Sequence, residues 1–166
     1  MRRVLLTLGI LGLLVAIPLS PASAVTGQHG ETFTASKSLK LKPGGQTITV
    51  TGEGFDTSVG IYIALCVVNK NVLAHKAAPT PCGGGADQSG TSGASIWVSS
   101  NPPTYAIGLT TPFSETGGFT EKLKVGAMIG KVDCRKKSCA IAVRADHTRG
   151  DDRSFDIFIP VTFLAK

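Results

Sequence analysis

Apolar and polar residues alternate along most of the chain after residue 25, and helical spacing is almost absent. Alternation with a period of two places apolar side chains on one face of a β-strand, because successive side chains point to opposite faces. The clearest run lies near the end of the chain and contains Phe155, Ile157, Ile159, Val161 and Phe163. Glycine, proline, asparagine and aspartate separate such runs, as in proteins with short turns. The sequence therefore predicts an all-β protein.

About seven such runs favour an immunoglobulin-like antiparallel β-sandwich, in which two sheets bury their apolar faces against each other. The predicted core residues are Ile48, Val50, Ile63, Leu65, Ile141, Val143, Ile157, Ile159 and Val161. An earlier run places Phe33, Ala35, Leu39 and Leu41 on one face. Segment 79–112 is rich in Gly, Ser, Thr and Pro. We predict a long loop there, and long loops in compact domains are often functional.

The N-terminus has the features of a secretion signal. Basic Arg2 and Arg3 precede an apolar run over 4–17, and Ala22-Ser23-Ala24 is a small-residue cleavage site. We expect residues 1–24 to be removed and residues 25–166 to form one secreted domain, extracellular or associated with the cell envelope. The alternative is an uncleaved anchor. No second apolar stretch of membrane length follows, so no transmembrane segment is expected in the mature chain.

The charge of the chain is mildly positive. It has 17 basic and 11 acidic residues, and without Arg2 and Arg3 the net charge is only +4. The basic residues are scattered, apart from a cluster at 135–137 that we interpret as a solvated hairpin tip. A basic stripe with interleaved aromatic residues, typical of nucleic-acid binders, is not present, and nucleic acid is not an expected partner.

Four cysteines, Cys66, Cys82, Cys134 and Cys139, allow three disulfide connectivities. An exported protein favours disulfides. The local pairing, Cys66 with Cys82 and Cys134 with Cys139, is favoured because each bond closes a short loop. A zinc site is the weaker alternative, since neither CxxC pairs nor histidines at finger spacing occur. We expect no metal.

Three stretches carry a resemblance to a known family: 45–55, 61–66, and Val132-Asp133-Cys134 followed after four residues by Cys139-Ala-Ile-Ala-Val. Together they resemble the neocarzinostatin family, over most of residues 32–163. Members are secreted actinobacterial proteins with an immunoglobulin-like sandwich and two disulfides, and they hold an enediyne antibiotic in a cleft on the outer face of one sheet. The resemblance implies the local disulfide pairing and a ligand-binding role.

The chain departs from the family where aromatic residues line that cleft. The corresponding stretches here are Val67-Val68-Asn69 and 125–130, and neither contains an aromatic residue. The chain therefore resembles a divergent member without the aromatic cleft residues. Similar modules occur in actinobacterial envelope proteins beside haem-binding domains. The alternative function is a structural or partner-binding module of the cell envelope, accessory to haem uptake.

The strand phase also predicts a binding face. If Ile61, Ile63 and Leu65 point into the core, the alternate side chains of three neighbouring strands point outward and are mostly small and apolar. A concave surface beneath a small apolar ligand would have this character, whereas a wet face is normally polar. The predicted ligand-binding residues are Tyr62, Ala64, Val68, Trp97, Ala140, Ala142, Arg144 and Phe158. The alternative is that segment 79–112 covers this face permanently.

The densest polar segment, 146–153, lies between the last two predicted strands, and Asp146 and His147 are candidate binding residues in it. The alternative interpretation is a polar turn with internal salt bridges. Ser154, His147 and Asp146 could be named as a catalytic set, but neighbours in sequence seldom form a triad and no nucleophile motif accompanies them. We expect no catalytic residues and no cofactor.

Overall fold

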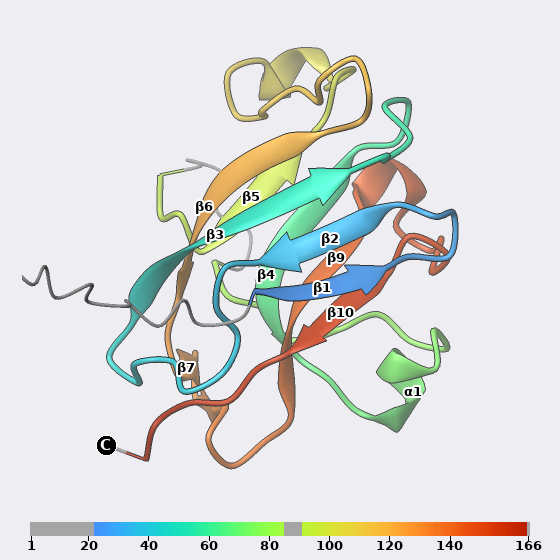
Figure 1. Cartoon of the computed structure of the whole chain (residues 1–166). Coiled ribbons are helices and arrows are strands. Elements are labelled where there is room, and N and C mark those ends of the chain that lie inside the picture. The colour runs from blue at the N-terminus through green and yellow to red at the C-terminus, as the bar shows by residue number, and fades with distance from the viewer. Residues whose placement is uncertain (1–21, 85–90, 166) are drawn as a thin grey trace, which may run out of the picture.

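Two four-stranded antiparallel sheets face each other in the computed structural model, which describes residues 22–84 and 91–165 (Figure 1). The first sheet has the order β1-β2-β3-β6 and the second the order β10-β9-β4-β5. The first sheet contains β1 (Ser23–Thr26), β2 (Thr32–Ala35), β3 (Gln46–Glu53) and β6 (Phe119–Val125). The second contains β4 (Ile61–Val67), β5 (Ser95–Val98), β9 (Cys139–Ala145) and β10 (Ile157–Pro160).

Small elements complete the fold. Strands β7 (Met128–Ile129) and β8 (Val132–Asp133) form a separate two-stranded hairpin. The helices are α1 (Lys70–Leu73) and the 3-10 helices η1 (Thr104–Ala106) and η2 (His147–Arg149). The predicted fold class is confirmed: the protein is nearly all β, and β3 beside β6 with β9 between β10 and β4 matches the strand order of immunoglobulin-like sandwiches. Strand β1 and the β7–β8 hairpin were not predicted.

The expected signal peptide lies outside the described residues up to residue 21. The last residues of that peptide are described: Ser23 and Ala24 pair with Ala35 and Thr34 and form the first half of β1. The Ser23 hydroxyl also makes a hydrogen bond of 2.6 Å with that of Ser38. Cleavage after Ala24 would therefore shorten an edge strand by two residues and leave the rest of the sheet paired.

One apolar core fills the space between the sheets. All nine residues predicted for it are buried, the most exposed being Val161 at 8%. The prediction that Leu39 shares a face with the buried Phe33, Ala35 and Leu41 is wrong, because Leu39 is 55% exposed. Lys40 has a φ of +52°, which breaks the alternation between Leu39 and the buried Leu41. Leu41 then bonds to Thr162 of the last segment instead of continuing β2.

Both predicted disulfides are present, Cys66–Cys82 and Cys134–Cys139. The first joins the end of β4 to the start of segment 79–112. That segment is less of a loop than predicted, because β5 pairs along β4 and becomes the edge strand of the second sheet. Residues 85–90 of the segment lie outside the described part. Within 22–84 and 91–165, no helix is long and apolar enough to cross a membrane.

Candidate functional site

The outer face of the second sheet carries the residues that the strand phase predicted. Ala64 of β4 lies opposite Ala142 of β9 on one side and Ser95 of β5 on the other. One row nearer η2, Tyr62 lies between Arg144 and Trp97. These pairs alternate with core residues such as Ile63, so the shared outward face is confirmed.

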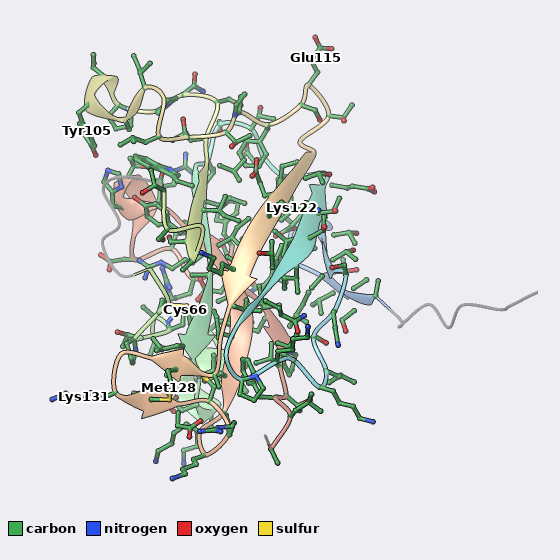
Figure 2. The ribbon with its side chains drawn as sticks, turned by 90° about the vertical axis from the view of Figure 1, so that its left-hand side faces the viewer. Cys66, Tyr105, Glu115, Lys122, Met128 and Lys131 are labelled. Atoms are coloured by element: carbon green, nitrogen blue, oxygen red, sulfur yellow. A yellow bond between two sulfur atoms is a disulfide. The ribbon has the colours of Figure 1, made fainter. Side chains whose placement is uncertain are left out.

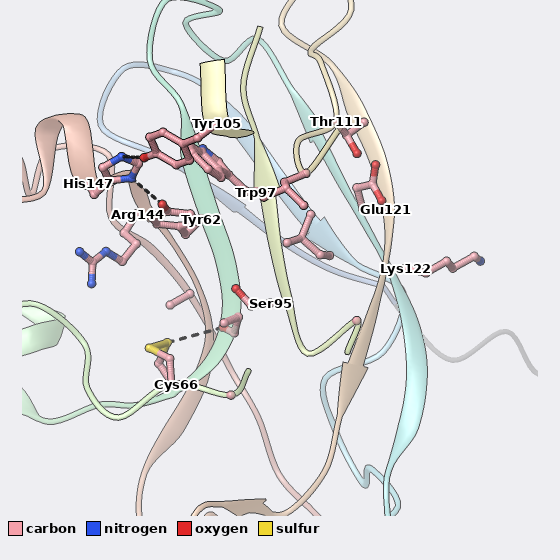
Figure 3. Close-up of a pocket in the computed structure, with 17 residues that line it drawn as sticks. Tyr62, Cys66, Ser95, Trp97, Tyr105, Thr111, Glu121, Lys122, Arg144 and His147 are labelled. Carbon is pink, nitrogen blue, oxygen red and sulfur yellow. Dashed lines mark hydrogen bonds between the residues drawn. A yellow bond between two sulfur atoms is a disulfide. The ribbon is translucent and has the colours of Figure 1, made fainter. Parts of the chain in front are cut away.

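A cleft of about 850 Å³ opens over part of this face (Figure 3). Its floor is Ala64, Ala142 and the Cys66–Cys82 disulfide, and Trp97 forms a wall. Small side chains leave this space because a methyl group projects only a short distance from the sheet. The remaining lining residues are Tyr62, Gly83, Gly93, Ser95, Ile96, Tyr105, Leu109, Thr111, Glu121, Lys122, Arg144 and His147. Such a volume is typical of small-molecule sites.

Not all the predicted face belongs to the cleft. Val68 and Ala140 do not line it, because they pack with Val72 of α1 and with Ala77 and are almost completely buried. Phe158 does not line it either and packs beside both groups of small residues. The small-residue face is thus divided, with one half covered and one half open. The cover over Val68 and Ala140 comes from α1 and the residues after it, whereas Cys82 of segment 79–112 packs against Ala64 and Ala142.

Segment 69–77 covers the face because Asn69 starts a short helix there. The Asn69 side chain accepts hydrogen bonds from the backbone N–H groups of Asn71 and Val72, at 2.8 and 3.1 Å. Asparagine is a favoured N-cap because its side chain satisfies donors that the first turn leaves unpaired. The cap directs Val72 onto Ala140 and Val68, which gives those two residues a structural role.

A chain of hydrogen bonds, Tyr62–His147–Tyr105, closes one end of the cleft. The Tyr62 hydroxyl lies 2.6 Å from Nδ1 of His147, and the Tyr105 hydroxyl lies 2.7 Å from its Nε2 (Figure 3). A neutral imidazole has one N–H and one lone pair, so it can serve both phenols at once. The chain links β4, η2 and η1, three segments that the sequence separates widely.

Trp97 faces outward, as its position between Ile96 and Val98 in the strand predicts, and its indole N–H makes a hydrogen bond within the protein. Its Nε1 donates to Oδ2 of Asp146 at 3.0 Å, and Oδ1 of Asp146 accepts from the backbone and hydroxyl of Thr148. Asp146 is buried and does not line the cleft. Gly60 permits its position, because a Cβ there would collide with the carboxylate. Of the two candidate loop residues, His147 therefore reaches the cleft and Asp146 supports its wall.

The electrostatics of the cleft are mixed. Burial raises the pKa of Tyr62 to about 12, and the nearby carboxylate of Asp146 adds to the shift. The phenol is therefore protonated at neutral pH and acts as a hydrogen-bonding group. Arg144 is half-buried beside Tyr62 and makes no salt bridge within the described residues. Glu121 adds a negative charge from the edge of the first sheet, whereas the Lys122 ammonium points away from the cleft and donates to Thr49 at 2.7 Å (Figure 3).

Neither the catalytic set named from the sequence nor a cluster of metal ligands is assembled within the described residues. Ser154 bonds to Asp152 and to His29, whereas both ring nitrogens of His147 bond to tyrosines. Ser154 and His147 therefore do not form a nucleophile–base pair in this structure. Across residues 22–84 and 91–165, no cluster of three or more histidine, cysteine or acidic side chains could hold a metal ion.

Sequence reasoning missed the far wall of the cleft. Ser95, Tyr105, Leu109 and Thr111 belong to segment 79–112, and Glu121 belongs to β6 of the other sheet. Only the presence of aromatic residues in a polar segment hinted at Tyr105. No local pattern could have shown that β6 lies close enough to contribute.

No protein-family model matches the sequence, and no curated protein matches it. Among solved structures, the chain is similar to one titled macromomycin. The two share 19% sequence identity, and the match covers 81% of this chain and 99% of that chain with a TM-score of 0.48.

Proposed function

We propose that the protein is a secreted, non-catalytic binding protein that holds a small, flat, largely apolar ligand in the cleft over β4, β5 and β9. The observation that carries this proposal is the outer face of the second sheet. A solvated face would carry long polar side chains, but this one presents Ala64, Ala142 and a disulfide beneath an aromatic wall.

The shape and chemistry of the lining support this ligand class. Trp97 and Tyr62 have ring centroids 5.3 Å apart and offer apolar surface to a planar group. A few polar groups, Arg144 and His147 among them, stand at the rim, where they can orient a ligand. The sequence resemblance to the neocarzinostatin family, carried by Cys134-x4-Cys139 and the stretches before it, favours the same role.

Ser95 offers the sharpest test of the cleft. It lies opposite Ala64 on an edge strand and is only half-buried, so Ser95→Phe fills the cleft without entering the core. Ala142 is a poorer probe because it is 1% exposed and lies opposite Phe158. Thr47→Phe is the matched control, since Thr47 is exposed on the outer face of the first sheet.

Two measurements use these variants. Native mass spectrometry of protein recovered from the medium of its host should show a bound small molecule. Titration with the fluorescent dye 1-anilinonaphthalene-8-sulfonate should show one site, weakened at least about tenfold in Ser95→Phe and unchanged in Thr47→Phe, because a lost site of this size is worth more than about 1.4 kcal/mol. Equal dye binding by all three proteins, with no co-purified molecule, would instead favour a structural module of the cell envelope.

A further inference from the structure

Three segments that are distant in sequence form one end of the sandwich. Segment 36–45 bonds to segment 161–165 through Leu41, and it bonds to segment 126–138 through the carbonyl of Pro43, which accepts from Ala127. Figure 1 shows them together around the β7–β8 hairpin, near the C-terminus. We call this the basic end, because its composition differs sharply from that of the rest of the molecule.

The basic end carries seven basic residues and one acidic residue. The basic residues are Lys37, Lys40, Lys42, Lys131, Arg135, Lys136 and Lys137. The acidic one, Asp133, is neutralised by Arg135 at 2.8 Å. The pKa of Asp133 falls to about 2 because Arg135 donates hydrogen bonds to it. The remaining cations at this end make no salt bridge within the described residues.

The opposite end of the sandwich has the reverse charge. It consists of 27–31, 53–60, 99–118 and 146–156, which are tied together by bonds such as those from Phe55 to Gly117 and from Asp146 to Gly60. It contains eight acidic residues and only two basic ones, Arg149 and Arg153. The acidic residues are Glu31, Glu53, Asp56, Glu115, Asp146, Asp151, Asp152 and Asp156. The modest net charge of the chain thus conceals a strongly dipolar molecule.

Large aliphatic side chains stand exposed among the cations. Leu39 is 55% exposed, Met128 is 53% exposed and Leu164 is 43% exposed. Figure 2 shows Met128 and Lys131 on the same hairpin, at the end of the molecule away from Tyr105 and Glu115. A surface that binds only a soluble polyanion needs cations alone. Aliphatic groups interspersed with cations suit a bilayer surface, where headgroups attract the charges and the hydrocarbon boundary accepts the apolar groups.

We propose that the basic end docks the protein on the surface of an anionic lipid bilayer. The charges at the two ends orient the molecule in the field of the membrane, so the acidic end points away. The Tyr62–His147–Tyr105 end of the cleft lies toward the acidic end and faces the aqueous side. This docking is independent of whether the cleft holds a ligand.

Protein recovered from the medium after secretion is tested by co-sedimentation with vesicles. The vesicles are phosphatidylcholine alone or phosphatidylcholine with about 30% phosphatidylglycerol, whose anionic headgroups give the surface a negative potential. Binding is expected only to the mixed vesicles and should weaken as salt is raised. Lys136→Glu with Lys137→Glu should weaken binding at least about 30-fold, because each cation near an anionic surface contributes on the order of 1 kcal/mol. Lys76→Glu with Arg149→Glu makes the same change in net charge near the acidic end, where His75 bonds to Arg153, and should leave most of the binding intact.

A second pair of variants separates a bilayer from a soluble polyanion. Leu39→Ser with Met128→Ser should weaken vesicle binding several-fold, whereas Leu73→Ser with Ile107→Ser, which changes exposed aliphatic residues elsewhere, should not. Circular dichroism verifies that each variant is folded. The proposal is overturned if binding is the same with and without phosphatidylglycerol, or if the two charge variants lose binding equally. It is also overturned if Leu39→Ser with Met128→Ser binds normally while dextran sulfate displaces the vesicles, since the end would then be a polyanion site.

Discussion

Asp146 and Asp156 are buried carboxylates that differ in how many of their oxygens accept hydrogen bonds. Both oxygens of Asp146 accept hydrogen bonds, from Trp97 and from Thr148. Asp156 forms a salt bridge of 3.1 Å with Arg153 through one oxygen, and its other oxygen has no partner within the described residues. Burial raises the pKa of Asp156 to about 6, with Arg153 opposing the shift. The first carboxylate is satisfied and the second is not.

Asp156 should make the protein less stable as pH rises. A folded-state pKa above the ordinary value means that stability is fully present below about pH 4 and is lost as pH rises through about 6. Asp156→Asn removes the titration. We compare the free energy of unfolding of this variant with that of the unchanged protein. The difference should shift in favour of the variant by on the order of 1–2 kcal/mol as pH rises from 4.5 to 7.5.

Urea denaturation at the two pH values measures this difference. Asp133→Asn is the control: its pKa is already about 2, so the effect of this substitution should not change over the same range. A pH-independent effect of Asp156→Asn would show that Asp156 is ionised in the folded protein throughout.

Trp97→Phe tests the support of the cleft wall. The phenylalanine retains an aromatic ring but leaves Oδ2 of the buried Asp146 without its donor. We expect a loss of about 1–3 kcal/mol in unfolding free energy, the cost of an unsatisfied buried polar group. Tyr105→Phe, at a residue that is 70% exposed, should cost less than about 0.5 kcal/mol. Equal losses in thermal or urea unfolding would contradict the structural role of the Trp97–Asp146 bond.

At the scale of elements, β9 is the centre of the second sheet. It pairs with β10 on one side and β4 on the other, and six of its seven residues, all except Arg144, are buried. Ile141 points into the core, and its neighbours Ala140 and Ala142 point outward, Ala140 beneath Val72 of α1 and Ala142 at the floor of the cleft. An internal strand with so little exposed surface is sensitive to substitution, because almost every side chain in it is packed against a neighbour.

Ile141→Ala should cost about 2–5 kcal/mol in unfolding free energy, because it leaves a cavity between the sheets. Thr120→Ala, on the exposed face of β6, should change stability by no more than about 0.5 kcal/mol. Urea denaturation followed by circular dichroism checks both values. A small effect at Ile141 would mean that the sheets do not pack at that point.

At the scale of the whole molecule, one core joins the two sheets. It contains Ile48 and Leu123 from the first sheet and Ile63 and Ile141 from the second. Neither sheet can bury its apolar face without the other, so both should unfold in one cooperative step.

Trp97, the only tryptophan in the chain, reports on the outer face of the second sheet. Its fluorescence and the far-ultraviolet circular dichroism of all strands should therefore give the same urea midpoint within error. If the fluorescence transition came first, the edge strand β5 and the cleft would be unfolding separately from the sandwich.

Much of this architecture follows from the sequence itself. Alternation along 46–53, 61–67 and 139–145 gives the strand phase, because side-chain direction in a strand depends only on position. The same rule predicts that Ala64 and Ala142 share an outward face with Tyr62. Short spacing favours both disulfides, since nearby cysteines close small loops. Leu39 does not follow this alternation, because the positive φ at Lys40 changes the direction of the side chains on either side of it.

Only the tertiary structure decided which part of that face stays open. Whether α1 covers Ala140 or segment 79–112 covers Ala142 depends on how non-adjacent segments pack, and strand periodicity carries no information about that. The same holds for His147, whose two tyrosine partners are 85 and 42 residues away. The basic end arises in the same way: cations scattered over 37–42 and 131–137 converge only when the sandwich closes, because spatial clustering is a property of the fold.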